Sequence, residues 1–195
     1  MKSLFTLLSL GLMLSLSACA SKPADNFSGN PEFAGSPKWV TGSCNNFFEK
    51  QGDVICGVGA VTGTKNVSLQ RTAAEGRART AIARALNVKV KSMLKDYQAT
   101  ITGGKAFKDA SDDEQYIADV AKQLTDISIS GTKTEDTWMS GTNTLYVLVS
   151  LDLQAFKESL NKVKSLNAEV RKAVEERAVS AFKELDKTLQ APVTE

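Results

Sequence analysis

The sequence contains no histidine among its 195 residues. Histidine is the commonest general base and the commonest metal ligand, so its absence removes the usual partner of a serine or cysteine nucleophile and the usual ligand of zinc. An acidic run lacks the alternating spacing and the central glycine of a calcium loop; it consists of Asp109, Asp112, Asp113 and Glu114. We therefore expect no catalytic residue, no cofactor site and no metal site, and a protein that is not an enzyme.

A nucleotide-binding glycine loop is also missing. Residues 57–63 (GVGAVTG) follow a β-type segment, but the third glycine of a dinucleotide-binding Gly-x-Gly-x-x-Gly pattern comes one residue late. The following Gly63-Thr64-Lys65 does not have the Gly-Lys-Ser or Gly-Lys-Thr order of a phosphate loop. The glycines instead indicate a strand on which a helix packs closely.

The chain has no strong excess of one charge. Its 24 Lys and Arg residues stand against 22 Asp and Glu residues, for a formal net charge of +2. Nucleic-acid-binding domains carry a clear basic excess, so we expect no nucleic-acid partner. With 42% hydrophobic and 24% charged residues, the composition is typical of a globular protein.

The apolar run of residues 4–16 is too short to span a bilayer, which takes roughly 20 apolar residues. It follows Lys2 and leads through two small residues to Cys19, which is the order of a secretory signal peptide over residues 1–18. The tetrapeptide Leu16-Ser17-Ala18-Cys19 resembles the lipobox of bacterial lipoproteins. This resemblance implies cleavage before Cys19, diacylglycerol on its sulfur, and a fatty acid such as palmitate on its new amino terminus.

Two or more acyl chains anchor a protein stably, so we expect a membrane-anchored rather than a membrane-spanning protein. The alternative is an ordinary secretion signal that happens to end in a cysteine. The polar segment that begins at Ser21 favours the lipoprotein. Ala20 follows Cys19 where an aspartate would act as an inner-membrane retention signal, so we expect the outer membrane, with the domain facing the periplasm.

Only three cysteines are present. If Cys19 carries lipid, Cys44 and Cys56 remain as a pair in an exported protein, and an oxidising compartment favours a disulfide between them. Their spacing is not Cys-x-x-Cys, so a thioredoxin-like or zinc motif is absent. The alternative is two free buried thiols.

Residues 19–36 are rich in Ser, Gly, Pro, Asn and Ala and predict a flexible tether, with ordered structure beginning at Pro37. A strand is expected over residues 54–61, and a helix over residues 69–98 with Ser68 as its N-cap. One face of that helix carries apolar residues at helical spacing, namely Ile82, Leu86, Val90, Met93 and Tyr97.

A second, shorter helix should begin at the capping box formed by Ser111 and Glu114 and run to about Leu124. Alternating Ile and Ser residues then predict a strand from residue 127 that continues to residue 138. A turn over residues 140–143 and a strand over residues 145–151 complete a hairpin. The order β-α-α-β-β-α predicts the α+β class, with helices packed on a small antiparallel sheet.

Asp152 should cap a third helical stretch that runs to Leu189, with a break at residues 165–167. Charge pairs four residues apart, Arg171 with Glu175 and Lys172 with Glu176, are expected on its outside. An apolar stripe close to heptad spacing predicts a surface for self-association or for a partner helix. The candidate partner surface consists of Val163, Val170, Val174, Ala181 and Leu185. The alternative is a tail that folds back and caps the domain.

Pro37-Lys38-Trp39-Val40, a strand ending in Val58-Gly59-Ala60, and the alanine-rich helix that follows resemble the LPP20 (Lipoprotein-20) family of bacterial envelope lipoproteins. Trp138 and the segment Tyr146-Val147-Leu148-Val149 resemble the closing strands of the family. The resemblance implies an LPP20-like domain over residues 37–155, with residues 156–195 as a helical extension. Members resemble the amino-terminal domain of the flagellar assembly protein FlgT, and some, of the FlgP type, serve at the flagellar base.

The function we expect is therefore non-enzymatic: an outer-membrane lipoprotein that contacts envelope or flagellar proteins in the periplasm. Such a protein could be an accessory of the flagellar basal ring or disc, and it could form a homo-oligomer. The alternative is an envelope binding module for peptidoglycan or a small ligand.

Overall fold

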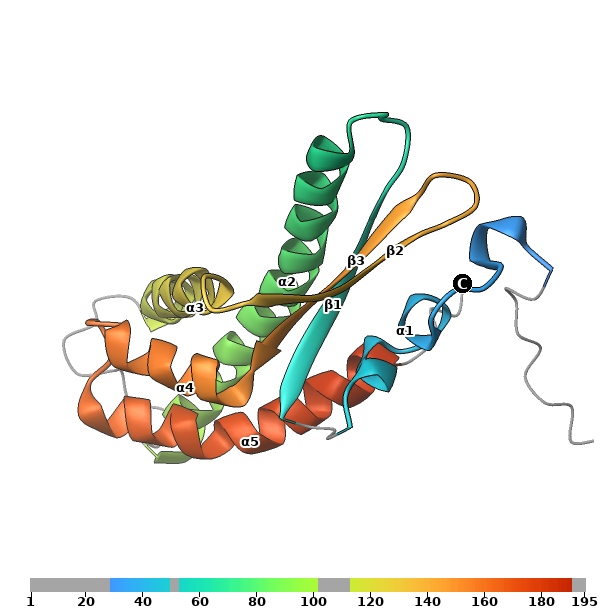
Figure 1. Cartoon of the computed structure of the whole chain (residues 1–195). Helices are drawn as coiled ribbons and strands as arrows, with labels where there is room; N and C mark the ends of the chain where they lie inside the picture. Colours follow the sequence, from blue (N-terminus) through green and yellow to red (C-terminus); the bar gives the residue numbers. More distant parts are fainter. Residues whose placement is uncertain (1–28, 50–52, 102–112, 191–195) are drawn as a thin grey trace, which may run out of the picture.

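The structure is a computed structural model, and it describes residues 29–49, 53–101 and 113–190. The signal peptide, the lipobox with Cys19, and the predicted capping residue Ser111 lie outside these ranges. Helices pack on a small three-stranded antiparallel sheet, so the α+β class is confirmed (Figure 1).

The sheet contains β1 (Val54–Val61), β2 (Lys133–Met139) and β3 (Leu145–Asp152) in the order β1-β3-β2. β3 pairs antiparallel with both neighbours, and it is buried along nearly its whole length. The turn between β2 and β3 covers residues 140–143, as predicted, and Asn143 adopts a φ of 65° there. Asn tolerates this left-handed conformation better than most residues.

Helix α2 (Val67–Ile101) crosses the sheet and packs directly on β1. A Cβ atom at Gly57 would stand only 2.6 Å from the carbonyl oxygen of Ala78, and one at Gly59 would overlap the carbonyl oxygen of Ala74. The glycines are therefore needed for the close helix–strand packing that their positions in the sequence predict. The apolar face of α2 is buried, as expected.

The N-cap of α2 differs from the prediction. The side chain of Asn66 accepts a hydrogen bond from the amide of Leu69 at 3.1 Å, and its carbonyl accepts one from Gln70 at 2.9 Å. Ser68 lies within the helix. Asn is as favoured an N-cap as Ser, so the helix begins earlier than Ser68 at no cost in capping.

Helix α3 (Asp113–Ile129) is longer than predicted, so the strand expected from residue 127 is wrong at its start. Ile117, Val120, Ala121 and Leu124 are buried as predicted, and Thr125 and Ser128 continue the same buried face at helical spacing. The alternation of Ile and Ser over four residues is too short to distinguish the two-residue period of a strand from the 3.6-residue period of a helix. The strand β2 begins only at Lys133.

The tail forms α4 (Leu153–Lys162) and α5 (Ala168–Gln190), separated by the predicted break. Asp152 caps α4 by accepting a hydrogen bond from the Ala155 amide at 2.7 Å. α5 contacts α2, α4 and β1, and it shares one core with them. None of the helices in the described ranges is long and apolar enough to cross a membrane.

The opposite face of the sheet is covered by the segment before β1. This segment contains η1 (Pro31–Phe33), α1 (Lys38–Thr41) and η2 (Cys44–Phe47). We call residues 31–48 the N-terminal clasp. Successive strand residues point to opposite faces, so Ile55 joins the core under α2 while Cys56 joins the cluster under the clasp. The molecule thus has three layers: helices, sheet and clasp.

Candidate functional site

The clasp encloses a second, smaller hydrophobic cluster on the sheet. Trp39, Cys44, Cys56 and Leu148 are buried in it, and Trp138 and Tyr146 pack against them. The indole Nε1 of Trp39 donates a hydrogen bond to Oδ2 of Asp136 on β2, at 2.9 Å. The Pro-x-Trp-Val segment therefore provides an anchor that joins the clasp to the edge strand of the sheet.

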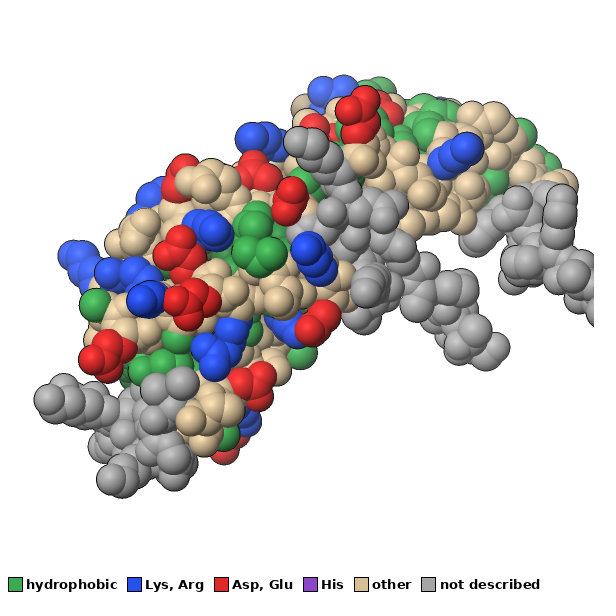
Figure 2. Space-filling model, turned by 90° about the horizontal axis from the view of Figure 1, so that it is seen from below, with side chains coloured by type: hydrophobic (Ala, Val, Ile, Leu, Met, Phe, Trp, Pro, Cys, Tyr) green, Lys and Arg blue, Asp and Glu red, His purple; other side chains and the backbone are tan. Residues whose placement is uncertain are grey.

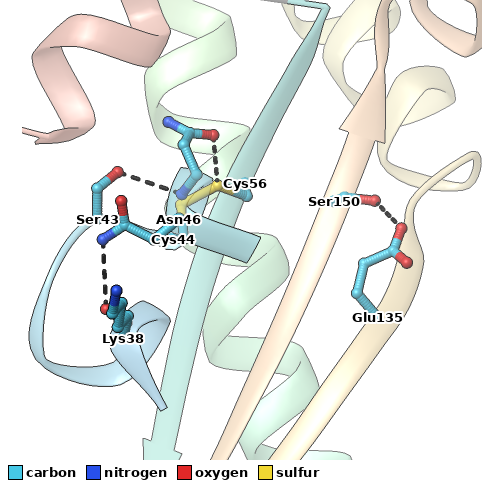
Figure 3. The surroundings of a disulfide bond; sticks show 8 residues. Lys38, Ser43, Cys44, Asn46, Cys56, Glu135 and Ser150 are labelled. Atoms are coloured by element: carbon cyan, nitrogen blue, oxygen red, sulfur yellow. Dashed lines mark hydrogen bonds between the residues drawn. A yellow bond between two sulfur atoms is a disulfide. The ribbon is translucent and has the colours of Figure 1, made fainter. Parts of the chain in front are cut away.

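A disulfide joins Cys44 of η2 to Cys56 of β1, with the two Cα atoms 6.0 Å apart (Figure 3). This is the pair expected from the sequence. Ser43 caps η2 by accepting a hydrogen bond from the amide of Asn45 at 3.2 Å. The buried side chain of Asn45 places Oδ1 at 3.0 Å from Sγ of Cys56. The disulfide thus holds the clasp against the middle layer.

The start of the clasp is tied to β3 by an aromatic and a carboxylate contact. The hydroxyl of Tyr146 donates a hydrogen bond to Oε1 of Glu32 at 2.8 Å, and its ring lies 5.4 Å from that of Trp138 and 6.3 Å from that of Phe33. Residues 31–33 had been expected in the flexible tether. They instead form a 3-10 turn that packs on the sheet, because Tyr146 supplies a partner distant in sequence.

These contacts shift the pKa of the Tyr146 hydroxyl and the pKa of the Glu32 carboxyl. Burial, and then the hydrogen bond and negative charge of Glu32, raise the pKa of Tyr146 from 10.0 to about 12. Burial acts to raise the pKa of Glu32, but hydrogen bonds with Tyr146, Thr144 and Ser140 together lower it below its usual value. Near neutral pH the pair is therefore a neutral phenol that donates to a carboxylate.

The candidate partner surface of the tail is buried within the chain. Val163, Val170, Val174 and Ala181 are each at most 2% exposed, and Leu185 is 8% exposed. They pack in the main core, where the rings of Phe156 and Phe182 lie 5.4 Å apart. The predicted docking surface is therefore wrong for this stripe, and the fold-back alternative describes the tail. The stripe could show that one face of the helix is apolar, but not what covers it.

Arg171 also differs from its predicted place. Its guanidinium group donates hydrogen bonds to the carbonyl oxygens of Leu160, Val163 and Leu166 at 3.0–3.2 Å. It therefore binds the carboxyl end of α4 and the turn that follows it, where a cation is favourable, and it does not form the expected outward pair with Glu175. Glu175 lies 3.9 Å from Lys157, whereas the expected pair of Lys172 and Glu176 is present at 3.9 Å.

Two hollows lie at opposite ends of the sheet. A hollow of about 760 Å³ borders the start of α4, where Lys133 and Asp152 form an ion pair at 3.3 Å. A hollow of about 470 Å³ lies between the β1–α2 loop and the β2–β3 turn. Within residues 29–49, 53–101 and 113–190, no group of three or more Cys, Asp or Glu side chains is gathered to hold a metal ion.

Several of these structural residues could not be identified from the sequence. Asp136, Glu32 and Gln70 each bind a partner that is distant along the chain, and no local pattern marks them. The sequence signal for Cys44 and Cys56 was the number of cysteines in the chain, and the signal for Trp39 was the Pro-x-Trp-Val segment. In the structure, these residues together hold the clasp on the sheet.

The chain was compared with curated proteins and with models of protein families. The search of curated proteins finds no match for the chain. The model of the LPP20 lipoprotein family matches residues 37–152, which begin within the clasp and end at the N-cap of α4. The matched region covers more than half of the chain, from Trp39 through the disulfide and α2 to the β2–β3 hairpin, and the chain therefore belongs to the LPP20 lipoprotein family.

Proposed function

We propose that this protein is an outer-membrane lipoprotein without enzymatic activity, anchored through acylated Cys19, whose α+β domain makes protein contacts in the periplasm. The observation that carries the proposal is membership of a lipoprotein family together with a lipobox ending at Cys19. The disulfide supports an oxidising compartment, where such bonds persist.

The use of polar side chains within the fold supports a non-enzymatic role. Asp136 binds Trp39, Glu32 binds Tyr146, and Asp152 caps α4. With no histidine in the sequence, these carboxylates lack the usual partner for general acid–base chemistry. Structural contacts account for each of them without a reaction.

The anchor is tested by cell fractionation of Cys19→Ser beside the parent protein. We expect the parent in the outer-membrane fraction with a mass increased by its acyl chains. The variant should be soluble or remain an uncleaved precursor. Equal partitioning of parent and variant into outer membranes would contradict the anchor, and parent protein in the inner membrane would contradict the sorting.

A more specific form of the proposal is an accessory role at the flagellar basal ring or disc. Surfaces for protein contact are available at Val88 on α2, which is 69% exposed, and at Val179 on α5, which is 37% exposed. A photo-crosslinking amino acid at either position in living cells should capture envelope proteins, and Lys91 on α2 serves as a polar control position. Deleting the gene should reduce swimming more than it raises sensitivity to envelope stress; the opposite result would contradict the flagellar role.

A further inference from the structure

The end of the molecule that carries the β1–α2 loop and the β2–β3 turn has a defined shape. The side chain of Gln70, which is 2% exposed, donates from Nε2 to the carbonyl oxygens of Val61 and Asn143, at 2.9 Å each. These two bonds join the loops side by side. We call residues 62–71 and 139–143 the loop tip.

Apolar side chains are concentrated on the loop tip. Val67 and Leu69 are each 58% exposed and Met139 is 40% exposed. They make up three of the six large hydrophobic side chains that are exposed in the described ranges. Val67 and Met139 also border the hollow of about 470 Å³ between the two loops. Exposed apolar side chains gathered at one end of the molecule make it a candidate interaction surface.

The charged side chains of the loop tip itself are basic, and the one carboxylate beside it, that of Glu32 on the clasp, is engaged by the hydroxyls of Tyr146, Thr144 and Ser140. Lys65 and Arg71 are the charged residues of the loop tip, and the sequence has no Asp or Glu between Asp53 and Glu75 or between Asp136 and Asp152. Elsewhere the two signs are mixed, as on the face seen from below in Figure 2, where acidic and basic side chains alternate. A cationic surface with apolar side chains is complementary to an anionic lipid bilayer.

The chain leaves the domain beside this same end. Glu32 is bound to Tyr146, and a Cβ atom at Gly141 in the β2–β3 turn would stand 3.9 Å from the carbonyl oxygen of Pro31 (Figure 1). Cys19 stands ten residues before Gly29, a span of at most ~35 Å when fully extended. Helix α2 alone is ~52 Å long, at 1.5 Å for each of its 35 residues. The loop tip is therefore the end that stays within reach of the anchor.

We propose that the loop tip rests on the surface of the membrane, with Val67, Leu69 and Met139 at the boundary between headgroups and acyl chains and with Lys65 and Arg71 on anionic phospholipid headgroups. This inference rests on the acylated Cys19 of the proposed function. The tether keeps the tip at high effective concentration near the bilayer, so a contact that is weak by itself is populated. The domain then stands on its tip, and α3, α4 and α5 face away from the lipid.

The test uses the full-length lipidated protein in vesicles of phosphatidylcholine and phosphatidylglycerol. An environment-sensitive dye is attached to Leu69→Cys and, as the matched control, to Val179→Cys on α5. Cys19 is acylated and the other two cysteines are bonded to each other, so only the new thiol is labelled. We expect blue-shifted emission and quenching by brominated acyl chains for the dye at position 69, and water-exposed emission for the dye at position 179.

Changing both Lys65 and Arg71 to Glu should reduce the quenching at position 69 by at least about twofold. For the labelled protein that keeps Lys65 and Arg71, vesicles without phosphatidylglycerol should reduce the quenching by a similar factor. A dye at position 69 that is as water-exposed as the one at position 179 would overturn the proposal, as would equal quenching at both positions. If the parent protein does not float with the vesicles, the lipid anchor itself is wrong and the tip contact falls with it.

Discussion

At the scale of single residues, a few polar side chains connect segments that are distant along the chain. Trp39 reaches Asp136 across 97 positions, and Tyr146 reaches Glu32 across 114 positions. Arg171 binds three carbonyl oxygens at the end of α4 and in the turn that follows it. Each bond satisfies a group whose burial would otherwise cost free energy, so these residues are important for the fold.

The bond between Tyr146 and Glu32 predicts a dependence of stability on alkaline pH. The pKa of Tyr146 is raised from 10.0 to about 12 in the folded protein. Its contribution to stability is therefore present below about pH 10 and is lost as the pH rises toward 12. We expect the free energy of unfolding, measured with urea, to fall over this range in the parent protein.

The variant Tyr146→Phe removes the titrating group and should show a smaller fall over the same range. Below about pH 9 it should be less stable than the parent by about 1–3 kcal/mol, since it lacks a hydrogen bond to a charged acceptor. The two proteins should approach each other in stability near pH 12. Parallel curves for parent and variant would contradict the assignment.

At the scale of elements, the clasp depends on the disulfide. The bond closes a separation of 12 residues between η2 and β1. We expect Cys56→Ala to lower the free energy of unfolding by about 2–4 kcal/mol and the melting temperature by several degrees. The double variant, with Cys44→Ala added, is the control and should lose no more than the single variant. Rapid alkylation of both thiols in the native, unreduced parent would show that the bond is not formed.

Because the apolar face of α5 is buried in the core, charged substitutions on that face should lower the free energy of unfolding. Val170 and Val174 are at most 1% exposed, so changing both to Glu would bury two carboxylates without partners. We expect a loss of at least about 4 kcal/mol in unfolding free energy, with no change in particle size before unfolding. Val179→Glu, at a 37% exposed position of the same helix, should change stability by less than about 0.5 kcal/mol. A smaller particle with unchanged melting temperature would instead identify α5 as a docking surface.

At the scale of the whole molecule, the three layers predict that the domain needs its clasp. A chain beginning at Asp53 would uncover Val58, Trp138, Tyr146 and Leu148 on the sheet. We expect this truncation to bind a hydrophobic dye and to aggregate, because a large exposed apolar patch favours association. A chain beginning at Gly29 is the matched control and should remain monodisperse. Equal solubility of the two would mean that the clasp is dispensable.

The sequence by itself determined the order of elements, the inward face of α2, the strand β3, the cap at Asp152 and the cysteine pair. Each of these rests on a local signal: a helical or alternating period, a capping residue, or the number and type of cysteines. Such signals act over a few residues and need no knowledge of the partner. They also carried the resemblance to the LPP20 family.

Only the tertiary structure decided what covers each apolar face. The stripe of α5 indicated burial, but whether against this chain or another depended on the return of the tail through the break at residues 165–167. Residues 31–36 looked like tether because their composition is polar, yet Tyr146 provides a contact there that lies far away in sequence. Residues 127–130 alternate like a strand, but residues 127–129 extend the buried face of α3 and are helical, and Ser130 lies in the turn after α3. Pairings between distant segments depend on how the whole chain packs, and for this reason the clasp and the loop tip became visible only in the fold.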